Sequence, residues 1–304
     1  MAEKKIYSGP ILVLALVQLV ESVAIGIPAS YFPNYITNLG ATVASIGLFT
    51  SSFMLASAIM SPKMGGLSDT YGRKKLMMAG IFGDVVFGIL QGIVPSWAWL
   101  LLIRIINGAV SGAAMISVNA LLIDIVDPEK RGEASGFVMS MRMVGHQIGP
   151  LFGGLIQWIG VSMGLTLLWS FRVPYFVDSI LALIALVLVA WKIEEPERTS
   201  PGPTGTGAMA SGGEKVPLSF SFKVMLVYAF ANGVGIGFAM PLMVLFYGDK
   251  FGLQPIGIGM IISVSGFIGL FASWFAGRLS DKFGRKPLIA AGNVVCVPAD
   301  SSCR

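Results

Sequence analysis

Charged residues are scarce in this chain: Asp, Glu, Lys and Arg make up 12% of its 304 residues, whereas hydrophobic residues make up 55%. Soluble domains carry about 25% charged residues, so this composition excludes a soluble globular core and indicates a lipid environment. Histidine occurs once, and the two cysteines, Cys296 and Cys303, have the spacing of neither a disulfide framework nor a metal site. The sequence therefore predicts no metal centre.

Motifs for catalysis and nucleotide hydrolysis are also missing. The chain has no G-x-x-x-x-G-K-[ST] phosphate loop, no G-x-S-x-G nucleophile elbow and no H-E-x-x-H helix. It shows no basic face with interleaved aromatic residues for nucleic acid, and its net charge of +5 reflects the loops between apolar runs. These absences predict a protein that is not an enzyme, needs no cofactor, is not driven by ATP and does not bind nucleic acid.

Long hydrophobic runs, by contrast, are abundant. A helix needs about 20 mostly apolar residues to cross a bilayer, and eight segments qualify: residues 10–33, 43–62, 76–94, 97–123, 133–158, 170–191, 219–246 and 255–276. A ninth run begins near Pro287 but turns polar after Val297, so it is too short to span alone. Most Lys and Arg residues fall in loops on one side of the spans. The positive-inside rule predicts a multi-pass protein of the cell membrane with a cytoplasmic N-terminus.

One pattern, G-x-L-S-D-x-[YF]-G-R-K, occurs twice, each time between two apolar runs. The second copy begins at Gly277, 212 residues after Gly65, and six of the predicted spans lie in that interval. The sequence therefore predicts a duplicated six-helix unit. The defining positions are Gly65, Leu67, Asp69, Gly72, Arg73 and Lys74 in the first copy and Gly277, Leu279, Asp281, Gly284, Arg285 and Lys286 in the second.

This pattern resembles motif A of the major facilitator superfamily of secondary transporters. The resemblance implies an all-α membrane protein with the major facilitator fold, in which the motif A loop is a gate latch for the outward-facing state. By chemistry, Gly72 permits a tight turn, Asp69 can meet a helix N-terminus or an arginine, and Arg73 and Lys74 can bind backbone carbonyls or lipid head groups. The alternative is that these charges only enforce topology.

Small residues recur in the fifth span. Gly145, Gly149 and Gly153 lie four residues apart and form a bare stripe on which another helix can pack closely, while Pro150 favours a kink. With Gly154 they match G-x-x-x-G-P-x-x-G-G. This resembles motif C of the same family and implies a proton-exchanging exporter, drug antiporters above all. The alternative is chance, because Gly and Pro are frequent in membrane helices.

Ionisable residues at membrane depth are costly and mark functional sites. Arg104 begins R-I-I-N-G in the fourth span, which resembles motif B and implies a role in proton coupling; a structural cation that snorkels to the interface is the alternative. Glu21, Asp84 and Asp178 are candidate proton carriers. Glu21 lies near the membrane midplane, and the resemblance favours it because the third and sixth helices lie outside the central cavity. The alternative is a permanent pair between Glu21 and Arg142, which is itself a coupling candidate.

Further polar residues within the spans have both a functional and a structural interpretation. His146 lies one turn from Arg142, where it could relay protons, bind substrate or form a hydrogen bond within the helix packing. Others could contact substrate or form ordinary interhelical hydrogen bonds: Gln18, Tyr31, Asn34, Asn107, Asn119 and Gln147. The sequence does not predict which residues bind substrate.

Residues 194–218 are rich in Pro and Gly and are predicted to form a flexible cytoplasmic linker. They separate a six-helix transmembrane bundle, residues 1–193, from an incomplete C-terminal bundle, residues 219–304, with two full helices and part of a third. The motifs favour a secondary transporter that exports small molecules or drugs across the lipid bilayer, driven by the proton gradient. The alternatives are a truncated, non-transporting remnant, a half-bundle that needs a partner chain, and a metabolite or sugar facilitator. The oligomeric state stays open.

Overall fold

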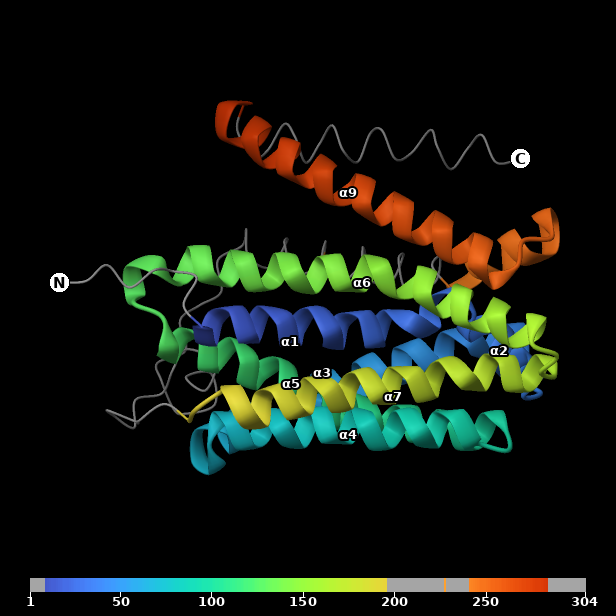
Figure 1. The fold of residues 1–304 in the computed structure, drawn as a ribbon, viewed down its shortest axis with the longest axis horizontal. Helices are drawn as coiled ribbons and strands as arrows, with labels where there is room; N and C mark the ends of the chain where they lie inside the picture. The colour runs from blue at the N-terminus through green and yellow to red at the C-terminus, as the bar shows by residue number, and fades with distance from the viewer. Residues whose placement is uncertain (1–8, 196–226, 228–240, 284–304) are drawn as a thin grey trace.

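The computed structural model describes residues 9–195, 227 and 241–283, and the long elements in these ranges are all α-helices (Figure 1). The all-α architecture predicted from the sequence is thus confirmed. Short helices flank several long ones: η1 (Ile27–Ser30) and α2 (Phe32–Asn38) follow α1, η2 (Val43–Ser45) precedes α3, and η3 (Pro128–Lys130) precedes α6. The long helices are α1 (Gly9–Gly26), α3 (Ile46–Tyr71), α4 (Arg73–Ile93), α5 (Trp97–Ile125), α6 (Arg131–Ser162), α7 (Leu167–Lys192) and α9 (Pro255–Phe283).

Six described stretches are long and apolar enough to cross a membrane: Gly9–Ser30, Val43–Ser61, Arg73–Ile93, Trp97–Ile125, Leu167–Lys192 and Pro255–Ser273. The fifth predicted span, residues 133–158, also lies in a helix, the 32-residue α6, but its charged residues and glycines make it more polar. Of the seventh predicted span, only Val227 and residues 241–246 are described. The ninth apolar run, near Pro287, lies outside the described residues.

The helices from α1 to α7 pack into one bundle. α1 lies against α6 and α7, α5 lies between α3 and α4, and α7 also packs on α4. α9 contacts this bundle mainly through α6. Figure 1 shows α9, in orange, close to α6 at one end and diverging from it toward the other.

The two ends of the bundle differ in charge. We call one the basic end, because the α3–α4 and α5–α6 junctions and the end of α7 bring residues 73–75, 130–131 and Lys192 there. The opposite end, which we call the far end, holds η1, α2 and the beginnings of α5, α7 and α9. α6 and α9 approach each other at the far end and separate toward the basic end (Figure 1).

Two buried hydrophobic clusters fill the bundle, one nearer each end. The basic-end cluster includes Leu14, Ile81 and Leu121. In the far-end cluster, Tyr31 stacks on Phe171, with ring centroids 5.9 Å apart, and meets Tyr175 edge to face at 5.8 Å. Between the clusters the helices present polar side chains, and these build the first candidate site.

Candidate functional site

A polar layer lies between the two hydrophobic clusters. It surrounds a cavity of about 60 Å³, to which α1, α4, α5 and α7 contribute the polar side chains. On α1, for example, Glu21 lies between Val17 of the basic-end cluster and Ile27 of the far-end cluster. The ionisable and hydrogen-bonding residues of the polar layer are Glu21, Asp84, Gln91, Arg104, Asn107, Ser111, Tyr175 and Asp178.

Glu21 is almost fully buried, with 6% of its surface exposed. The Nε2 of Gln18, one turn earlier on α1, donates a hydrogen bond of 2.9 Å to the Glu21 Oε2. Within the described ranges, no Lys or Arg lies at ion-pair distance from Glu21. Glu21 and Arg142 thus form no direct ion pair in this arrangement, but the Arg142 guanidinium still lies close enough to act electrostatically on the Glu21 carboxylate.

Arg104 enters the polar layer from α5 between two aromatic rings. Its Cζ lies 4.4 Å from the ring centroid of Phe32 and 5.7 Å from that of Phe53. Such cation–π contacts stabilise a cation away from water. Its buried Nε has no hydrogen-bond partner among the described residues, so the guanidinium keeps donor capacity inside the bundle.

Asp84 and Asp178 line the same cavity as Glu21 and Arg104. The Ser111 Oγ lies 2.5 Å from the Asp84 Oδ1, and the buried Asp84 Oδ2 has no partner in the described part of the chain. The Asp178 Oδ2 lies 3.4 Å from where a Cβ of Gly88 would be. The absence of a side chain at Gly88 thus lets the Asp178 carboxylate approach α4 one turn beyond Asp84.

Sequence reasoning ranked these two aspartates below Glu21, because their helices lie toward the outside of the expected fold. The structure brings all three carboxyl groups to one cavity, since Asp84 and Asp178 face the interior of the bundle itself. A signal was present: Asp84, Gly88 and Gln91 share one face of α4 at i, i+4 and i+7.

The first motif A copy joins α3 to α4. Gly72 has φ = +107°, a conformation that favours glycine. The Glu195 carboxylate accepts hydrogen bonds from the backbone N–H groups of Arg73, at 2.6 Å, and Lys74, at 3.0 Å. A carboxylate from beyond α7 thereby caps the positive N-terminus of α4.

The motif A side chains also tie α4 to its neighbours. Arg73, which is 8% exposed, pairs with Asp124 through a 2.8 Å Nε–Oδ2 contact, approaches Asp69 at 3.6 Å and donates to the Ala120 carbonyl. The Lys74 Nζ donates to the carbonyl of Ala190 at 2.9 Å. Sequence reasoning missed Asp124 and Glu195, because nothing in the local pattern of either segment links it to motif A.

Other motif A positions make fewer contacts. Gly65 has open space where a Cβ would lie, and Leu67 is 40% exposed. In the second copy, Gly277, Leu279 and Asp281 fall within the last turns of α9. Its remaining positions, Gly284, Arg285 and Lys286, lie outside the described residues.

The glycine stripe of motif C is where α6 meets α1. A Cβ at Gly149 would lie 2.6 Å from the Gly26 Cα, and one at Gly153 would overlap the carbonyl oxygen of Ile27. A Cβ at Gly145 would likewise overlap the α1 backbone, at the carbonyl oxygen of Leu19. The two helices therefore touch backbone to backbone, as the small-residue stripe predicts.

The other side of motif C meets α9. A Cβ at Gly154 would overlap the Pro255 carbonyl, and one at Gly259 would overlap the Pro150 carbonyl. Pro150 lies inside α6 without ending it. Motif C thus holds α6 against α1 on one side and against the first turns of α9 on the other.

A larger cavity, about 610 Å³ in volume, opens where α6 and α9 diverge toward the basic end. Its apolar lining comes mainly from Met115, Met139, Met143 and Leu270, and its polar lining from Arg142, His146 and Gln147. Arg142 and His146 therefore belong to this methionine-lined cavity, whereas Glu21 and Arg104 belong to the polar layer.

The remaining polar candidates are distributed over the molecule. Tyr31 is in the far-end cluster, Asn34 lines a third cavity at the far end, and Asn119 is exposed on α5. Across the described ranges, no group of three or more His, Cys, Asp or Glu residues could hold a metal ion.

Known proteins resemble this chain in both sequence and fold. Quinolone resistance protein NorA of Staphylococcus aureus (strain MSSA476) is 24% identical over 274 residues, covering 88% of this chain and 66% of that protein. Multidrug resistance protein 2 of Bacillus subtilis (strain 168) is 26% identical over 278 residues, covering 89% of this chain and 66% of that protein. The chain therefore spans 66% of the length of either relative.

Solved structures share the fold. A bacterial homolog of the human lysosomal transporter Spinster, in an inward-facing and unoccupied conformation, matches with a TM-score of 0.74 and 20% identity, over 93% of this chain and 64% of that one. A D-xylose–proton symporter matches with a TM-score of 0.57 and 16% identity, over 91% of this chain and 70% of that one. The family profile described as Major Facilitator Superfamily matches residues 14–299. The chain therefore belongs to the Major Facilitator Superfamily and is a multi-pass membrane protein of the transporter class rather than an enzyme.

Proposed function

We propose that this chain works as a proton-coupled exporter of small, largely apolar molecules, with its basic end on the cytoplasmic side of the cell membrane. The observation that carries the proposal is the polar layer, in which three carboxyl groups and one arginine line a single cavity between two hydrophobic clusters. The names of the relatives, a quinolone resistance protein and a multidrug resistance protein, favour export of drug-like compounds.

The charges of the polar layer do not balance without protons. Arg104 can compensate Asp178 and Arg142 can compensate Glu21, which leaves the Asp84 carboxyl group without a cation between apolar walls. An unpaired charge inside a membrane bundle is costly, so this cost favours proton uptake while the layer is closed. Access to water on one side would then allow release, which is the step that coupling to a proton gradient requires.

The methionine-lined cavity is the proposed substrate route. Methionine side chains are flexible and polarizable, so they adapt to apolar molecules of different shape. Arg142, His146 and Gln147 add polar contacts to the same cavity. Its volume of about 610 Å³ lies within the range of about 300–1,000 Å³ that suits drug-sized ligands.

The proposed transport cycle rocks residues 1–193 against residues 219–304, with residues 194–218 as the linker. Because α6 and α9 touch at the far end and separate at the basic end, the described arrangement corresponds to a state open to the cytoplasm. Motif C supplies the contact about which the two parts would rotate.

The proposal is tested with the full chain in proteoliposomes. A pH gradient should drive accumulation of a fluorescent apolar dye, and Glu21→Gln should reduce this transport at least about tenfold because the variant cannot exchange a proton. Arg104→Ala should also uncouple transport. Glu194→Gln, an exposed carboxyl outside the polar layer, is the control and should behave as the unmodified chain. Failure of the unmodified chain to respond to the gradient, or normal coupled transport by Glu21→Gln, would overturn the assignment.

A further inference from the structure

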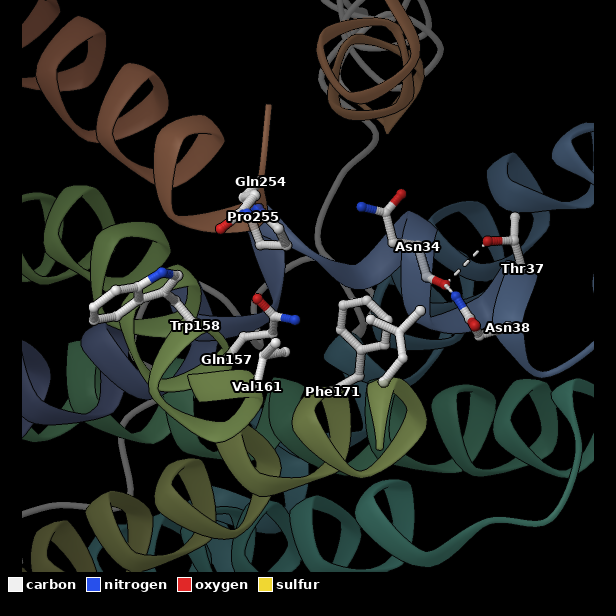
Figure 2. A pocket seen from close by; sticks show the side chains of 10 residues that line it. Asn34, Thr37, Asn38, Gln157, Trp158, Val161, Phe171, Gln254 and Pro255 are labelled. Atoms are coloured by element: carbon white, nitrogen blue, oxygen red, sulfur yellow. Dashed lines mark hydrogen bonds between the residues drawn. The ribbon is translucent and has the colours of Figure 1, made fainter. Parts of the chain in front are cut away.

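A third cavity lies at the far end, between α2, α6, α7 and the start of α9, and has a volume of about 310 Å³. Figure 2 shows Asn34 and the pair Gln254 and Pro255 on one side of this space and Gln157 and Phe171 on the other. It is separate from the polar layer and from the methionine-lined cavity, with which it shares no lining residue.

The chemistry of this cavity is unlike that of the other two. Four carboxamide side chains line it, from Asn34, Asn38, Gln157 and Gln254, and no charged side chain does so among the described residues. A carboxamide offers both donors and an acceptor. A cavity lined in this way suits ligands that carry several hydrogen-bonding groups and no net charge, because a charged ligand would lose hydration without gaining a counter-charge.

Two of the carboxamides, those of Gln157 and Asn38, are held in place by hydrogen bonds. The four carboxamides together still have donors and acceptors that are not used in hydrogen bonds. Gln157 is 4% exposed, and its Nε2 donates to the Ser170 Oγ at 3.1 Å, which orients its carbonyl oxygen. The Asn38 Nδ2 donates to the backbone carbonyl of Asn34 at 2.8 Å. The Asn34 side chain has no hydrogen-bond partner within the described ranges. The cavity is thus partly preorganised, which lowers the cost of binding.

Aromatic and apolar side chains complete the lining. The Phe171 ring is buried, with 3% of its surface exposed, whereas Trp158 is 43% exposed at the rim. A flat apolar face beside carboxamides matches a ring that has C–H groups on its faces and hydroxyl groups around its edge. The volume lies at the lower limit for ligand sites, about 300 Å³, which restricts the ligand to a small molecule.

We propose that the far-end cavity binds a small uncharged molecule of the monosaccharide class, a neutral ring bearing several hydroxyl or N-acetyl groups. The carboxamides bind its edge, the exposed Trp158 ring packs against one of its faces, and the buried Phe171 closes the cavity behind it. Because the lining comes from α2, α6 and α7 on one side and from the start of α9 on the other, a bound ligand bridges both sides. It therefore stabilises the arrangement in which α6 and α9 touch at the far end.

The test measures direct binding, so it does not depend on whether the chain transports. The full chain in nanodiscs is titrated by calorimetry and saturation-transfer NMR with neutral hexoses and N-acetylhexosamines. The matched uronates, which differ by a ring carboxylate, serve as charged counterparts. Saturable binding of at least one neutral sugar, and at least about tenfold weaker binding of its uronate, is expected.

Substitutions of cavity residues test whether the ligand binds there. Asn34→Ala and Gln254→Ala should each weaken sugar binding about tenfold, through loss of one or two hydrogen bonds. Gln254 is exposed, so its variant keeps the proposal testable even if a buried substitution such as Gln157→Ala fails to fold. Asn119→Ala removes an exposed carboxamide elsewhere on α5 and should leave binding unchanged. Absence of saturable binding, equal affinity for the uronates, or binding that survives both cavity variants would overturn the proposal.

Discussion

At the far end, α6 and α9 touch through the backbone at Gly154 and Gly259, whereas toward the basic end a cavity of about 610 Å³ separates the same two helices. The residue types follow this difference. On α6, glycine and proline occupy the contact, whereas methionine, arginine and histidine occupy the open part. A backbone contact has no side chains to rearrange, so it can stay in place while the other end opens and closes around flexible side chains.

The basic end also shows which helices stay together when that gap opens. Arg73 links α4 to α5 through Asp124 and the Ala120 carbonyl, and Lys74 and Glu195 link α4 to the end of α7. The opening therefore lies between the bundle and α9, while α4, α5 and α7 remain joined. Motif C and motif A thus have complementary positions, at the closed far end and at the basic end.

The largest expected effect comes from breaking the far-end contact between α6 and η1. Gly153→Val would place a side chain against the Ile27 carbonyl, and backbone on both sides cannot yield, so we expect a loss of about 3 kcal/mol or more in unfolding free energy. Unfolding in mixed micelles measures it. Gly136→Val on the same helix is the control, because nothing lies within 4 Å of that position. Equal stability of the two variants would contradict the backbone contact.

A similar but smaller loss is expected at the basic end. Arg73→Gln removes the ion pair with Asp124 and the contact with the Ala120 carbonyl, and should destabilise the bundle by about 1–3 kcal/mol, because the partly exposed partner carboxylate loses its cation but keeps some access to water. Lys75→Gln, which changes an exposed neighbour, should cost little. If both variants unfold alike, the motif A charges serve topology alone.

Gly154→Ala tests the α6–α9 contact separately from the bundle. Its methyl group would meet the Pro255 carbonyl and the Ile256 Cα, so the far end should open at a cost of about 1–3 kcal/mol while the bundle itself stays folded. Spin labels on Ser162→Cys and Lys250→Cys, with the native cysteines replaced by serine, report the far-end distance. An unchanged distance distribution would show that this contact does not hold the far end closed.

The smallest effect is expected at the cap of α4. Glu195→Gln keeps an acceptor but removes the negative charge at the helix N-terminus, for an expected loss of about 0.3–1 kcal/mol. Glu194→Gln changes an exposed neighbour with the same chemistry. A difference in melting temperature between these two variants measures the cap, and identical melting would remove Glu195 from the motif A network.

Much of the architecture was predictable because membrane helices have a strong local signal. The apolar runs gave the helices, and the spacing of Gly145, Gly149 and Gly153 gave a close helix contact, since four-residue spacing on a helix always produces one face. The partner of that face was not predictable, and neither was the second contact of motif C with α9. Which helix fills a bare stripe depends on how distant segments pack.

The candidate site was likewise only partly predictable from the sequence. The sequence identified Glu21 and Arg104 as ionisable residues at membrane depth, because such residues are rare and costly there. It did not identify the shared cavity with Asp84 and Asp178, nor the separate cavity of Arg142 and His146. Depth along a helix follows from residue number, but the direction in which a side chain faces depends on the rotation of the helix within the bundle.

The sequence alone determined the membrane environment, the helices and the three short motifs, because hydropathy and residue spacing act within a single segment. Only the tertiary structure decided that Glu195 caps α4 across 122 residues of chain, that three carboxyl groups and Arg104 line one cavity, and that the backbones of α6 and α9 touch at the far end. These features join segments far apart in the chain, and their geometry is set by how whole helices pack against one another rather than by any local pattern.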